Sequence, residues 1–384
     1  MKILLVAPQP FYSERGTPIA VRLLVETLCE FGHQVDLLVY HDGDDIAVPG
    51  MRLLRAWRPP GVRQVPIGIS WQKLACDALL VTKMIGLLLR NQYDVIHAVE
   101  ESVFPAAAFG LFSKRKLVYD MDSSLSEQLL DKWTPLRPLA AAFRWLERAA
   151  VRRSAVILPV CEDLAHKVRP WTDAWRVTVL PDVPVGDPSP VGVHDSLRDI
   201  AGPRSVIGLY VGNLERYQGI DLLVDGLAAL SKDVDLRMVV IGGSPGDVAR
   251  YRQRAQELGI ADRISFLGPR PLAHLNAYLA QADVLVSPRT MGQNTPMKVY
   301  SYMQSGKAIL ATDIRSHTQA LDATCAELVP PEPAAVARGL ERLARDESRR
   351  RLLGNAARLK AESEYSLGAY RVRLRHAYSQ LVSG

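Results

Sequence analysis

The chain has 384 residues, of which 48% are hydrophobic and 23% are charged. This length exceeds what one core usually serves, and the composition excludes a disordered or fibrous chain, so two globular domains are expected. The net charge of +6 is mild for this length. It allows an anionic ligand or an acidic membrane surface. No basic stripe with interleaved aromatic residues accompanies it, so nucleic acid is not expected as a partner.

Cysteine usage and hydropathy favour a cytoplasmic location. The four cysteines are scattered without paired spacing, which is typical of core residues in a reducing compartment. The apolar run over residues 1–7 is too short for a signal peptide and predicts a first buried strand. The most apolar helical stretch, 74–89, carries Asp77 and Lys83 and is too short to span a bilayer.

The first half of the chain alternates buried strands with helices. The pattern predicts a strand over 3–7, a helix over about 19–31 that Gly32 ends, and a strand over 33–40. Further segments follow in chain order, with strands over 94–97, 116–120, 155–159 and 177–180 and a helix over 139–153. Such alternation is typical of a parallel sheet with helices on both faces.

The alternation restarts after a stretch rich in Pro and Gly, 181–190, which is typical of a linker. The second set of predicted strands covers 206–211, 237–241, 264–266, 283–286 and 308–310, and charged helical sequence fills 334–379. The predicted domains are 1–183 and 204–364, joined by a linker over 184–203, with a last helix over about 365–384 that is free to pack back on the first domain. We expect an α/β protein with two doubly wound, Rossmann-like domains facing a cleft, and ligands at the carboxyl ends of the strands.

Residues 287–312 carry the clearest functional signal. A strand ends in a turn-rich loop, 289–296, and a helix then begins near Met297 and ends at Gly306. This places backbone N–H groups and the positive end of a helix at the carboxyl end of a strand, which suits a phosphate ester. Lys298 in the first helical turn opposes the helix dipole unless an anion is bound there. The alternative is an ordinary turn with a solvated lysine.

We therefore predict a diphosphate site on this loop. Lys298 is the first catalytic candidate and Arg289 the second, because a departing diphosphate needs cations and donors placed in advance. The loop amides of Gln293, Asn294 and Thr295 would assist, and Arg216 is a further basic candidate. Gly212 and Gly243 follow predicted strands, where glycine lets backbone approach a ligand or simply makes a turn.

Candidate acceptor-side residues follow the strands of the first half. Gly16 and Thr17 open a helix, with Thr17 as a possible N-cap and no GxGxxG fingerprint. Glu100, Asp120 and Asp122 follow strands and would bind acceptor hydroxyls or cap helices. An Asp-x-Asp pair also invites a metal interpretation, which the doubly wound pattern argues against. His97, at the end of an apolar strand, is interpreted as structural.

Two segments, 52–63 and 132–153, mix Arg with Trp. The mixture suits peripheral contact with anionic lipid, and a solvated basic surface is the alternative.

The second half resembles retaining glycosyltransferases of the GT-B fold, family 4. The resemblance rests on four ordered segments: GNLERYQGIDLL (212–223), LRMVVIGG (236–243), ISFLG (264–268) and NTPMKVYSYMQSGKA (294–308). The first half agrees more weakly, through a loop ending in Gly16, FGHQV (31–35), YDVIHA (93–98) and VTVLP (177–181). The resemblance implies a nucleotide-sugar donor on the second domain, an acceptor on the first, retention of configuration, and neither metal nor cofactor. Arg270 falls in the region that meets the nucleobase in that family.

The chain departs from the family at the donor site. Where the family usually has Arg and Lys that hold the diphosphate, this chain has Asn213 and Gln218. The paired glutamates of the family, the second of which binds ribose, fall on Gln293 and Ser301. Some branches use a Pro-x-Lys loop instead, and Pro296-Met-Lys298 resembles it.

The main hypothesis is a metal-independent transferase that moves a sugar from a nucleotide sugar to a glycan or lipid-linked acceptor. One alternative is a catalytically weak or inactive relative that binds a nucleotide or glycan. The other is a nucleotide-sugar epimerase, which shares the two-domain architecture.

Overall fold

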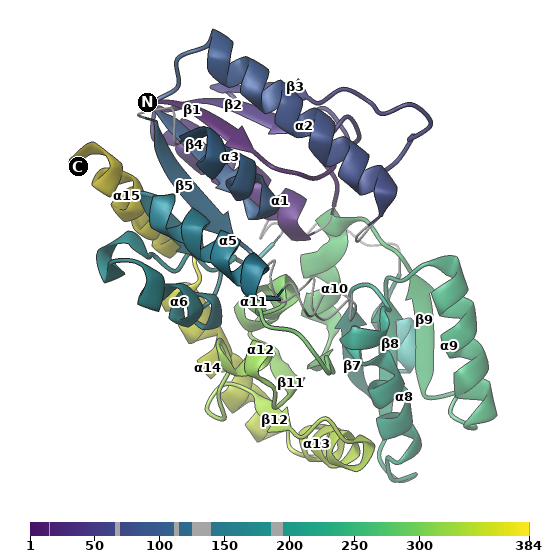
Figure 1. Ribbon diagram of the computed structural model, residues 1–384. Helices are drawn as coiled ribbons and strands as arrows, with labels where there is room; N and C mark the ends of the chain where they lie inside the picture. Colours follow the sequence, from purple (N-terminus) through teal and green to yellow (C-terminus); the bar gives the residue numbers. More distant parts are fainter. Residues whose placement is uncertain (15, 66–69, 111–114, 125–139, 186–194, 384) are drawn as a thin grey trace. The chain divides into compact units, whose positions relative to one another are not determined.

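The computed structural model describes residues 1–14, 16–65, 70–110, 115–124, 140–185 and 195–383. The chain forms two compact units (Figure 1). The first contains Met1–Pro181 and Tyr370–Gly384, and the second contains Asp182–Ala369. Residues 186–194 of the predicted linker, 184–203, lie outside the described residues, and its later part contains a helix, Leu197–Ala201.

The first unit is a sheet of six parallel strands in the order β3-β2-β1-β4-β5-β6. Its strands are β1 (Lys2–Val6), β2 (Gln34–Val39), β3 (Met51–Arg55), β4 (Val95–Val99), β5 (Lys116–Met121) and β6 (Val156–Pro159). Its helices are α1 (Gly16–Glu30), α2 (Trp71–Arg90), α3 (Val103–Gly110), α5 (Ala140–Arg153), α6 (Glu162–Val168) and the short turns η1 (Glu100–Ser102), η3 (Arg169–Trp171) and η4 (Ala174–Arg176). Central strands of Val, Ile and Leu are buried on both faces, as parallel sheets require.

The last helix, α15 (Leu367–Ser383), packs on the sheet of the first unit. The Tyr378 hydroxyl lies 2.7 Å from Nδ1 of His97, the middle residue of β4. Lys116 Nζ donates to the carbonyl of Leu381 at 2.6 Å, and the Arg371 guanidinium pairs with Glu30 of α1. These contacts join the end of the chain to the amino-terminal sheet.

The second unit repeats the architecture, with parallel strands in the order β12-β11-β10-β7-β8-β9. The strands are β7 (Val206–Val211), β8 (Leu236–Ile241), β9 (Ile264–Gly268), β10 (Val284–Ser287), β11 (Ala308–Thr312) and β12 (Glu327–Val329). The helices are α7 (Leu197–Ala201), α8 (Ile220–Ala228), α9 (Pro245–Glu257), α10 (Leu275–Gln281), α11 (Met297–Gln304), α12 (Arg315–Thr318), α13 (Pro333–Arg345), α14 (Glu347–Glu364) and the turns η5 (Arg216–Gln218) and η6 (Leu272–His274).

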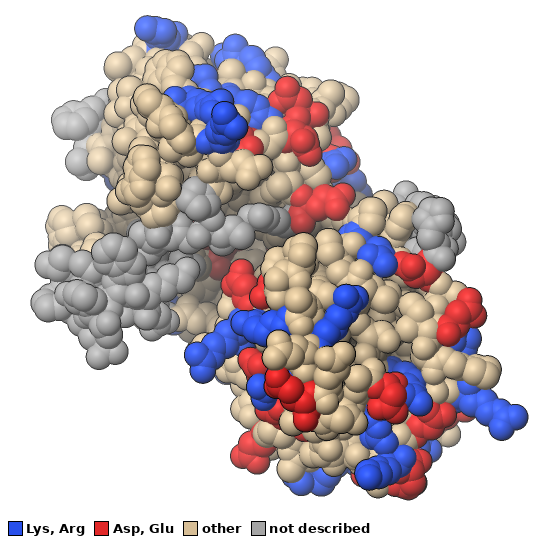
Figure 2. All heavy atoms as spheres, turned by 90° about the vertical axis from the view of Figure 1, so that its right-hand side faces the viewer, with Lys and Arg blue, Asp and Glu red and all other residues tan. Residues whose placement is uncertain are grey.

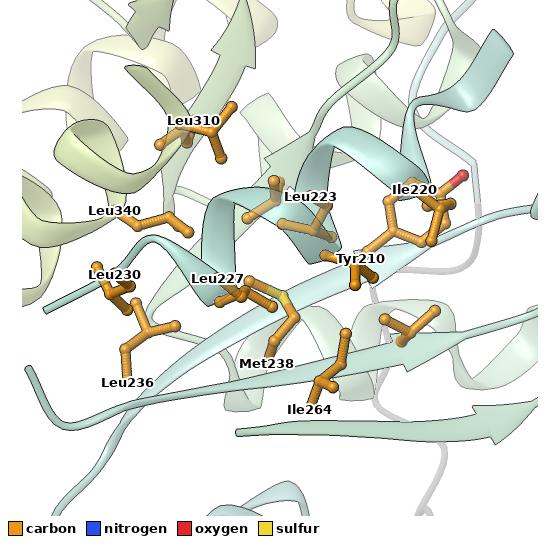
Figure 3. Close-up of a cluster of buried hydrophobic side chains, with 14 of the residues drawn as sticks. Tyr210, Ile220, Leu223, Leu227, Leu230, Leu236, Met238, Ile264, Leu310 and Leu340 are labelled. Carbon is orange, nitrogen blue, oxygen red and sulfur yellow. The ribbon is translucent and has the colours of Figure 1, made fainter. Parts of the chain in front are cut away.

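Separate apolar cores lie on the two faces of this second sheet, because successive strand residues point to opposite faces. Tyr210 packs in one core with α8 and α13, while its neighbour Leu209 packs in the other with α11. Figure 3 shows the first of these cores, where Leu223 and Leu227 of α8 lie over Tyr210 and Met238 of the strands.

The structure confirms the predicted fold class, and it also differs from the predicted elements in the places that follow. The edge strands β3 and β12 were not predicted, because short edge strands carry weak patterns. Residues 177–180, a predicted strand, are not one. Val177 forms only an isolated bridge with Ile157, and the N–H groups of Thr178 and Leu180 donate to carbonyls of β6.

The predicted helix near residue 19 begins earlier, at Gly16. Thr17 therefore lies inside the first turn of α1, and its prediction as N-cap was wrong. Within the described residues, no helix has the length and apolar character needed to cross a membrane. On the face drawn in Figure 2, Lys and Arg side chains are interspersed with Asp, Glu and uncharged surface.

Candidate functional site

Each sheet reverses its strand order between two neighbouring strands, β1 and β4 in the first unit and β7 and β10 in the second. In doubly wound sheets, ligands bind outside the carboxyl ends of the strands at this reversal. The loops that follow these strands are therefore the candidate sites. Those of the second unit, after β7 and β10, contain most of the predicted donor-site residues.

The loop after β10 is folded around Arg289. This side chain is only 9% exposed. Its Nε donates to the carbonyl of Met291 at 2.6 Å and its Nη1 to that of Asn294 at 3.1 Å. Gly292, at a φ of 138°, lies so close to the guanidinium that a Cβ could not fit. Arg289 thus organises the loop and leaves a positive charge within it.

Lys298, in the first turn of α11, reaches the loop after β7. Its Nζ donates to Gln218 Oε1 at 3.1 Å and lies 3.9 Å from the centroid of the Tyr210 ring. A Cβ on Gly212 would stand 3.1 Å from the same nitrogen. Burial and then the nearby charge of Arg289 hold the pKa of Lys298 well below its usual range.

Lys298 and Arg289 have no carboxylate within ion-pairing distance among the residues that the structure describes. Two partly buried cations without a counter-charge repel each other. An anion bound beside both of them would compensate their charges and reduce this repulsion. α11 begins after Pro296 without a side-chain cap, so its first N–H groups can also receive an anion. Thr295 is 3% exposed, and its hydroxyl has no hydrogen-bond partner within the described part of the chain. The geometry suits a phosphate group.

The two loops are tied to each other. The N–H of Thr290 donates to the carbonyl of Tyr217 at 3.0 Å. Gly219, at a φ of 74°, is so close to the other loop that an added Cβ would stand 1.9 Å from the Pro288 carbonyl oxygen. Gln218 is thereby held where its amide oxygen meets Lys298. An amide oxygen accepts from Lys298 without neutralising its charge.

Of the other residues predicted near the donor, two are exposed on the loop after β7 and one is packed in the loop after β8. Asn213 and Arg216 are exposed on the loop after β7. Gly243 packs against Leu214, where a Cβ would stand 2.5 Å from the leucine side chain. The close packing of the loops after β7 and β8 therefore explains why position 243 has a glycine. The sequence had predicted that Gly243 either approaches a ligand or makes a turn.

Two residues that the family pattern suggested for the nucleoside have other partners. Arg270 Nε donates to Asp195 Oδ2 at 2.7 Å and its Nη1 to the carbonyl of Leu267 at 2.6 Å. Ser301 is 1% exposed, and its hydroxyl accepts from the N–H of Val185 at 2.8 Å. Ser301 thus anchors the entering chain and has no surface left for a ribose.

Gln293 lies on the loop beside these groups. Its carbonyl accepts from Gln319 Nε2 at 2.6 Å, and its side chain is half-buried. Its position beside Asn294 and Thr295 keeps it on the predicted phosphate loop.

Beneath this loop lies a buried polar network that the sequence analysis missed. It joins Ser287 at the end of β10, Thr312 at the end of β11, and His317 of α12. The only sequence signal was that two neighbouring apolar strands each end in a hydroxyl residue, which is too common to single out.

The candidate acceptor residues of the first unit form an acidic cluster after β4 and β5. Glu100 has a φ of 49°, a conformation that costs a residue with a side chain about 1 kcal/mol or more. The Ser123 hydroxyl donates to it at 3.3 Å. Burial and then the neighbouring Glu101 carboxylate raise the pKa of Glu100 to about 7. Glu101 itself pairs with Lys73 of α2.

Asp120 and Asp122 lie at and beyond the end of β5. Asp120 Oδ2 is 3.4 Å from His97 Nε2, and His97 is fully buried against Tyr378, which fits its interpretation as a structural residue. Gly16 and Thr17 stand apart, at the start of α1. Among the residues described, no three His, Cys, Asp or Glu side chains lie close enough to hold a metal ion.

The raised pKa of Glu100 predicts how stability changes with pH. Since the folded state binds this proton more tightly than the unfolded state, the stability it contributes is fully present below pH 4.5 and is lost as the pH rises through about 7. Glu100→Gln, which stays neutral, should therefore raise Tm relative to the wild type at pH 8 and have little effect at pH 4.5. Calorimetry across this range tests the prediction, and equal Tm differences at both pH values would contradict it.

Two doubly wound domains, one of which has a basic loop at its strand reversal, match the architecture of GT-B glycosyltransferases. Residues 205–346 match the family described as "Glycosyl transferases group 1", and residues 15–182 match the "Glycosyl transferase 4-like domain". Together these matches span most of the chain, which belongs to the group 1 glycosyltransferases.

One curated relative extends this similarity over most of the chain, and another over a shorter part. The chain is 25% identical over 358 residues to the phosphatidyl-myo-inositol mannosyltransferase of Mycobacterium leprae, covering 90% of this chain and 88% of that protein. A D-inositol 3-phosphate glycosyltransferase of Corynebacterium glutamicum is 32% identical, but the match spans 27% of this chain and only 26% of the relative's length.

Solved structures share the fold at lower identity. Sucrose-phosphate synthase from Thermosynechococcus elongatus has a TM-score of 0.80 at 21% identity, covering 100% of this chain and 99% of the other. Anabaena HepE, solved in complex with UDP-glucose, has a TM-score of 0.74 at 18% identity, with 100% of each chain covered.

Proposed function

We propose that this glycosyltransferase moves a sugar from a nucleotide-sugar donor to a glycan or lipid-linked acceptor, with retention of anomeric configuration and without a bound metal or cofactor. The observation that carries the proposal is the pair of cations, Lys298 and Arg289, that have no carboxylate partner among the described residues and lie at the uncapped start of α11. The HepE complex with UDP-glucose supports the donor class. The mycobacterial mannosyltransferase, whose name specifies a phosphatidylinositol acceptor, supports a lipid-linked acceptor.

The chemistry follows from the charge that develops on the leaving group. When the bond between the sugar and the diphosphate breaks, the electrons of that bond stay on the phosphate oxygen. A cation and N–H groups fixed in advance stabilise this charge more than they stabilise the bound donor, which lowers the barrier. Lys298 and the first amides of α11 would act in this way, with Arg289 holding the loop in shape. Retention and independence from metal rest on the family resemblance.

The acceptor would bind to the first unit. Glu100, Asp120 and Asp122 are carboxylates at the ends of β4 and β5, where they can accept hydrogen bonds from sugar hydroxyls. Gly16 and Thr17 lie at the start of α1, the helix that follows β1, and β1 is next to β4 in the sheet. This assignment is part of the proposal.

Peripheral contact with a membrane from the cytoplasmic side is also proposed. Exposed apolar residues recur along one face of α2, at Trp71, Leu74, Ile85 and Leu89, with Trp57 exposed as well. The arginines of the two basic segments differ in their surroundings. Arg52 and Arg55 of β3 are paired with Asp36 and Asp45, whereas Arg144 and Arg148 of α5 are exposed with Trp145. Residues 132–139 of the predicted basic segment lie outside the described residues.

Sedimentation with vesicles tests the membrane proposal. The protein should pellet with vesicles that contain anionic lipid, and the double variant L74S/L89S should pellet less. The membrane proposal would be contradicted if the wild type remained in the supernatant at low salt to the same extent as the double variant.

Turnover tests the function itself. The protein should release UDP, GDP or ADP from one of a panel of nucleotide sugars when glycan and lipid-linked acceptors are present, and NMR of the product should show the donor's anomeric configuration. Tight nucleotide binding without transfer to any acceptor, or interconversion of the donor sugar alone, would contradict the proposal.

A further inference from the structure

The polar network beneath the loop after β10 is connected to the candidate phosphate site. His317, Ser287 and Thr312 are completely buried. His317 Nε2 lies 2.8 Å from the Ser287 hydroxyl, and its Nδ1 lies 2.9 Å from the Thr312 carbonyl oxygen. The Thr312 hydroxyl in turn donates to the carbonyl of Arg289, the residue around which the loop is folded. The network thus spans two strand ends and the first turn of the loop.

The partners fix where the protons lie. A carbonyl oxygen can only accept, so the proton on His317 is on Nδ1, which donates to Thr312. Nε2 must then accept from the Ser287 hydroxyl. The Thr312 hydroxyl gives its own proton to Arg289. A neutral imidazole in this pattern has a single tautomer, with its proton on Nδ1.

A neutral imidazole suits this position, because two cations lie nearby. Burial first, and then the charges of Lys298 and Arg289, lower the pKa of His317 to about 4. A protonated imidazole here would add a third positive charge under the loop. A neutral one can hold the backbone without repelling the cations.

We infer that His317 is a positioning residue for donor binding. Acting through Thr312, it fixes the carbonyl of Arg289 and so the loop that presents Arg289, the loop amides and Lys298 to the donor phosphates. This inference rests on the proposed function. His317 does not contact the donor itself. Because it holds the loop in place before the donor binds, less conformational entropy is lost on binding.

Substitutions at Thr312 test the connection to the loop. Thr312→Val keeps the shape and removes the hydroxyl that donates to Arg289, and Thr312→Ser restores a hydroxyl. By calorimetry with UDP, GDP and ADP, the nucleotide that the wild type binds best should bind Thr312→Val about tenfold more weakly, since one hydrogen bond and the order it imposes are lost. Thr312→Ser should bind within about threefold of the wild type.

His317 is tested with a matched pair. His317→Asn keeps an N–H that can reach the Thr312 carbonyl, whereas His317→Leu keeps none. We expect the Asn variant to bind the nucleotide clearly better than the Leu variant. Ser316→Ala is the control, because the Ser316 hydroxyl, next to His317 in the same helix, is buried and has no hydrogen-bond partner among the residues that the structure describes. It should bind like the wild type.

The outcomes separate the two proposals. If Thr312→Val and Thr312→Ser lose thermal stability equally and bind the nucleotide like the wild type, the network is only structural and the inference is overturned. If the donor KM rises for Thr312→Val and recovers for Thr312→Ser, with Tm close to that of the wild type, the inference is supported. If the wild type binds none of the three nucleotides, the proposed donor site fails, and the inference fails with it.

Discussion

Replacing Lys298 with Met is expected to weaken nucleoside diphosphate binding by roughly 10- to 100-fold, because a charge-assisted hydrogen bond contributes about 1.5–3 kcal/mol. Methionine keeps the length of the side chain and removes its charge. In the unliganded enzyme, Nζ has an amide oxygen and an aromatic ring as partners. The loss of Nζ should therefore cost folding little, because the variant also removes a partly buried cation, and Tm should stay close to that of the wild type. Calorimetry with the tightest-binding nucleotide measures the effect.

A lysine elsewhere in the unit provides the control. Lys232 is exposed in the turn before β8, and Lys232→Met should leave nucleotide affinity unchanged. Transfer should fall at least as far as binding in Lys298→Met, since the leaving group carries more charge in the transition state than in the bound donor. Undiminished affinity in a folded Lys298→Met variant would remove Lys298 from the phosphate site.

Replacing Gly219 with Ala is expected to separate the two loops of the site. Its backbone has a φ of 74°, which costs alanine about 1 kcal/mol, and the new Cβ would stand 1.9 Å from the Pro288 carbonyl oxygen. Backbone must move to relieve that overlap, so we expect a total loss of about 3 kcal/mol in unfolding free energy. Because Gln218 and Lys298 meet across these loops, nucleotide binding should fall as well. Urea unfolding and calorimetry measure the two effects.

Gly259→Ala is the matched control. Gly259 has a φ of 67°, and nothing lies within 4 Å of an added Cβ. It should show the backbone cost of about 1 kcal/mol without the steric one and should keep its nucleotide affinity. Similar stability losses in both variants, with nucleotide binding intact in Gly219→Ala, would show that the close approach of the loops does not shape the site.

The sequence was sufficient for the repeated architecture and for the position of the main loop. Buried strands of Val, Ile and Leu alternating with helices left few alternatives to two doubly wound sheets. A helix that begins near Met297 and ends at Gly306 followed from local rules, and the structure has α11 over Met297–Gln304. These features depend on residues close together in the chain.

Partners that are distant in the chain could not be predicted. Ser301 stands where the family pattern expects a ribose ligand, yet it bonds to Val185, more than a hundred positions earlier. Arg270 was expected near a nucleobase and pairs with Asp195. Whether a polar side chain faces a ligand or a neighbour depends on packing that periodicity does not encode.

The partners of the basic segment 52–63 could not be predicted from the sequence either. Its Arg and Trp content suited lipid contact or a solvated basic surface, and in the structure Arg52 and Arg55 belong to β3, where both pair with carboxylates. The more suggestive apolar surface lies on α2, whose exposed residues recur at Trp71, Leu74, Ile85 and Leu89. Composition alone did not show which basic residues pair within the fold or that α2 has exposed apolar residues, because exposure rather than residue type distinguishes a surface patch from a sheet edge.

A crystal structure of the protein with its tightest-binding nucleoside diphosphate tests the central claim most directly. We expect the terminal phosphate oxygens within hydrogen-bonding distance of Lys298 Nζ and of the first N–H groups of α11, with the loop 289–296 little changed. Phosphates bound elsewhere on the second unit, with Lys298 still donating to Gln218, would contradict the account.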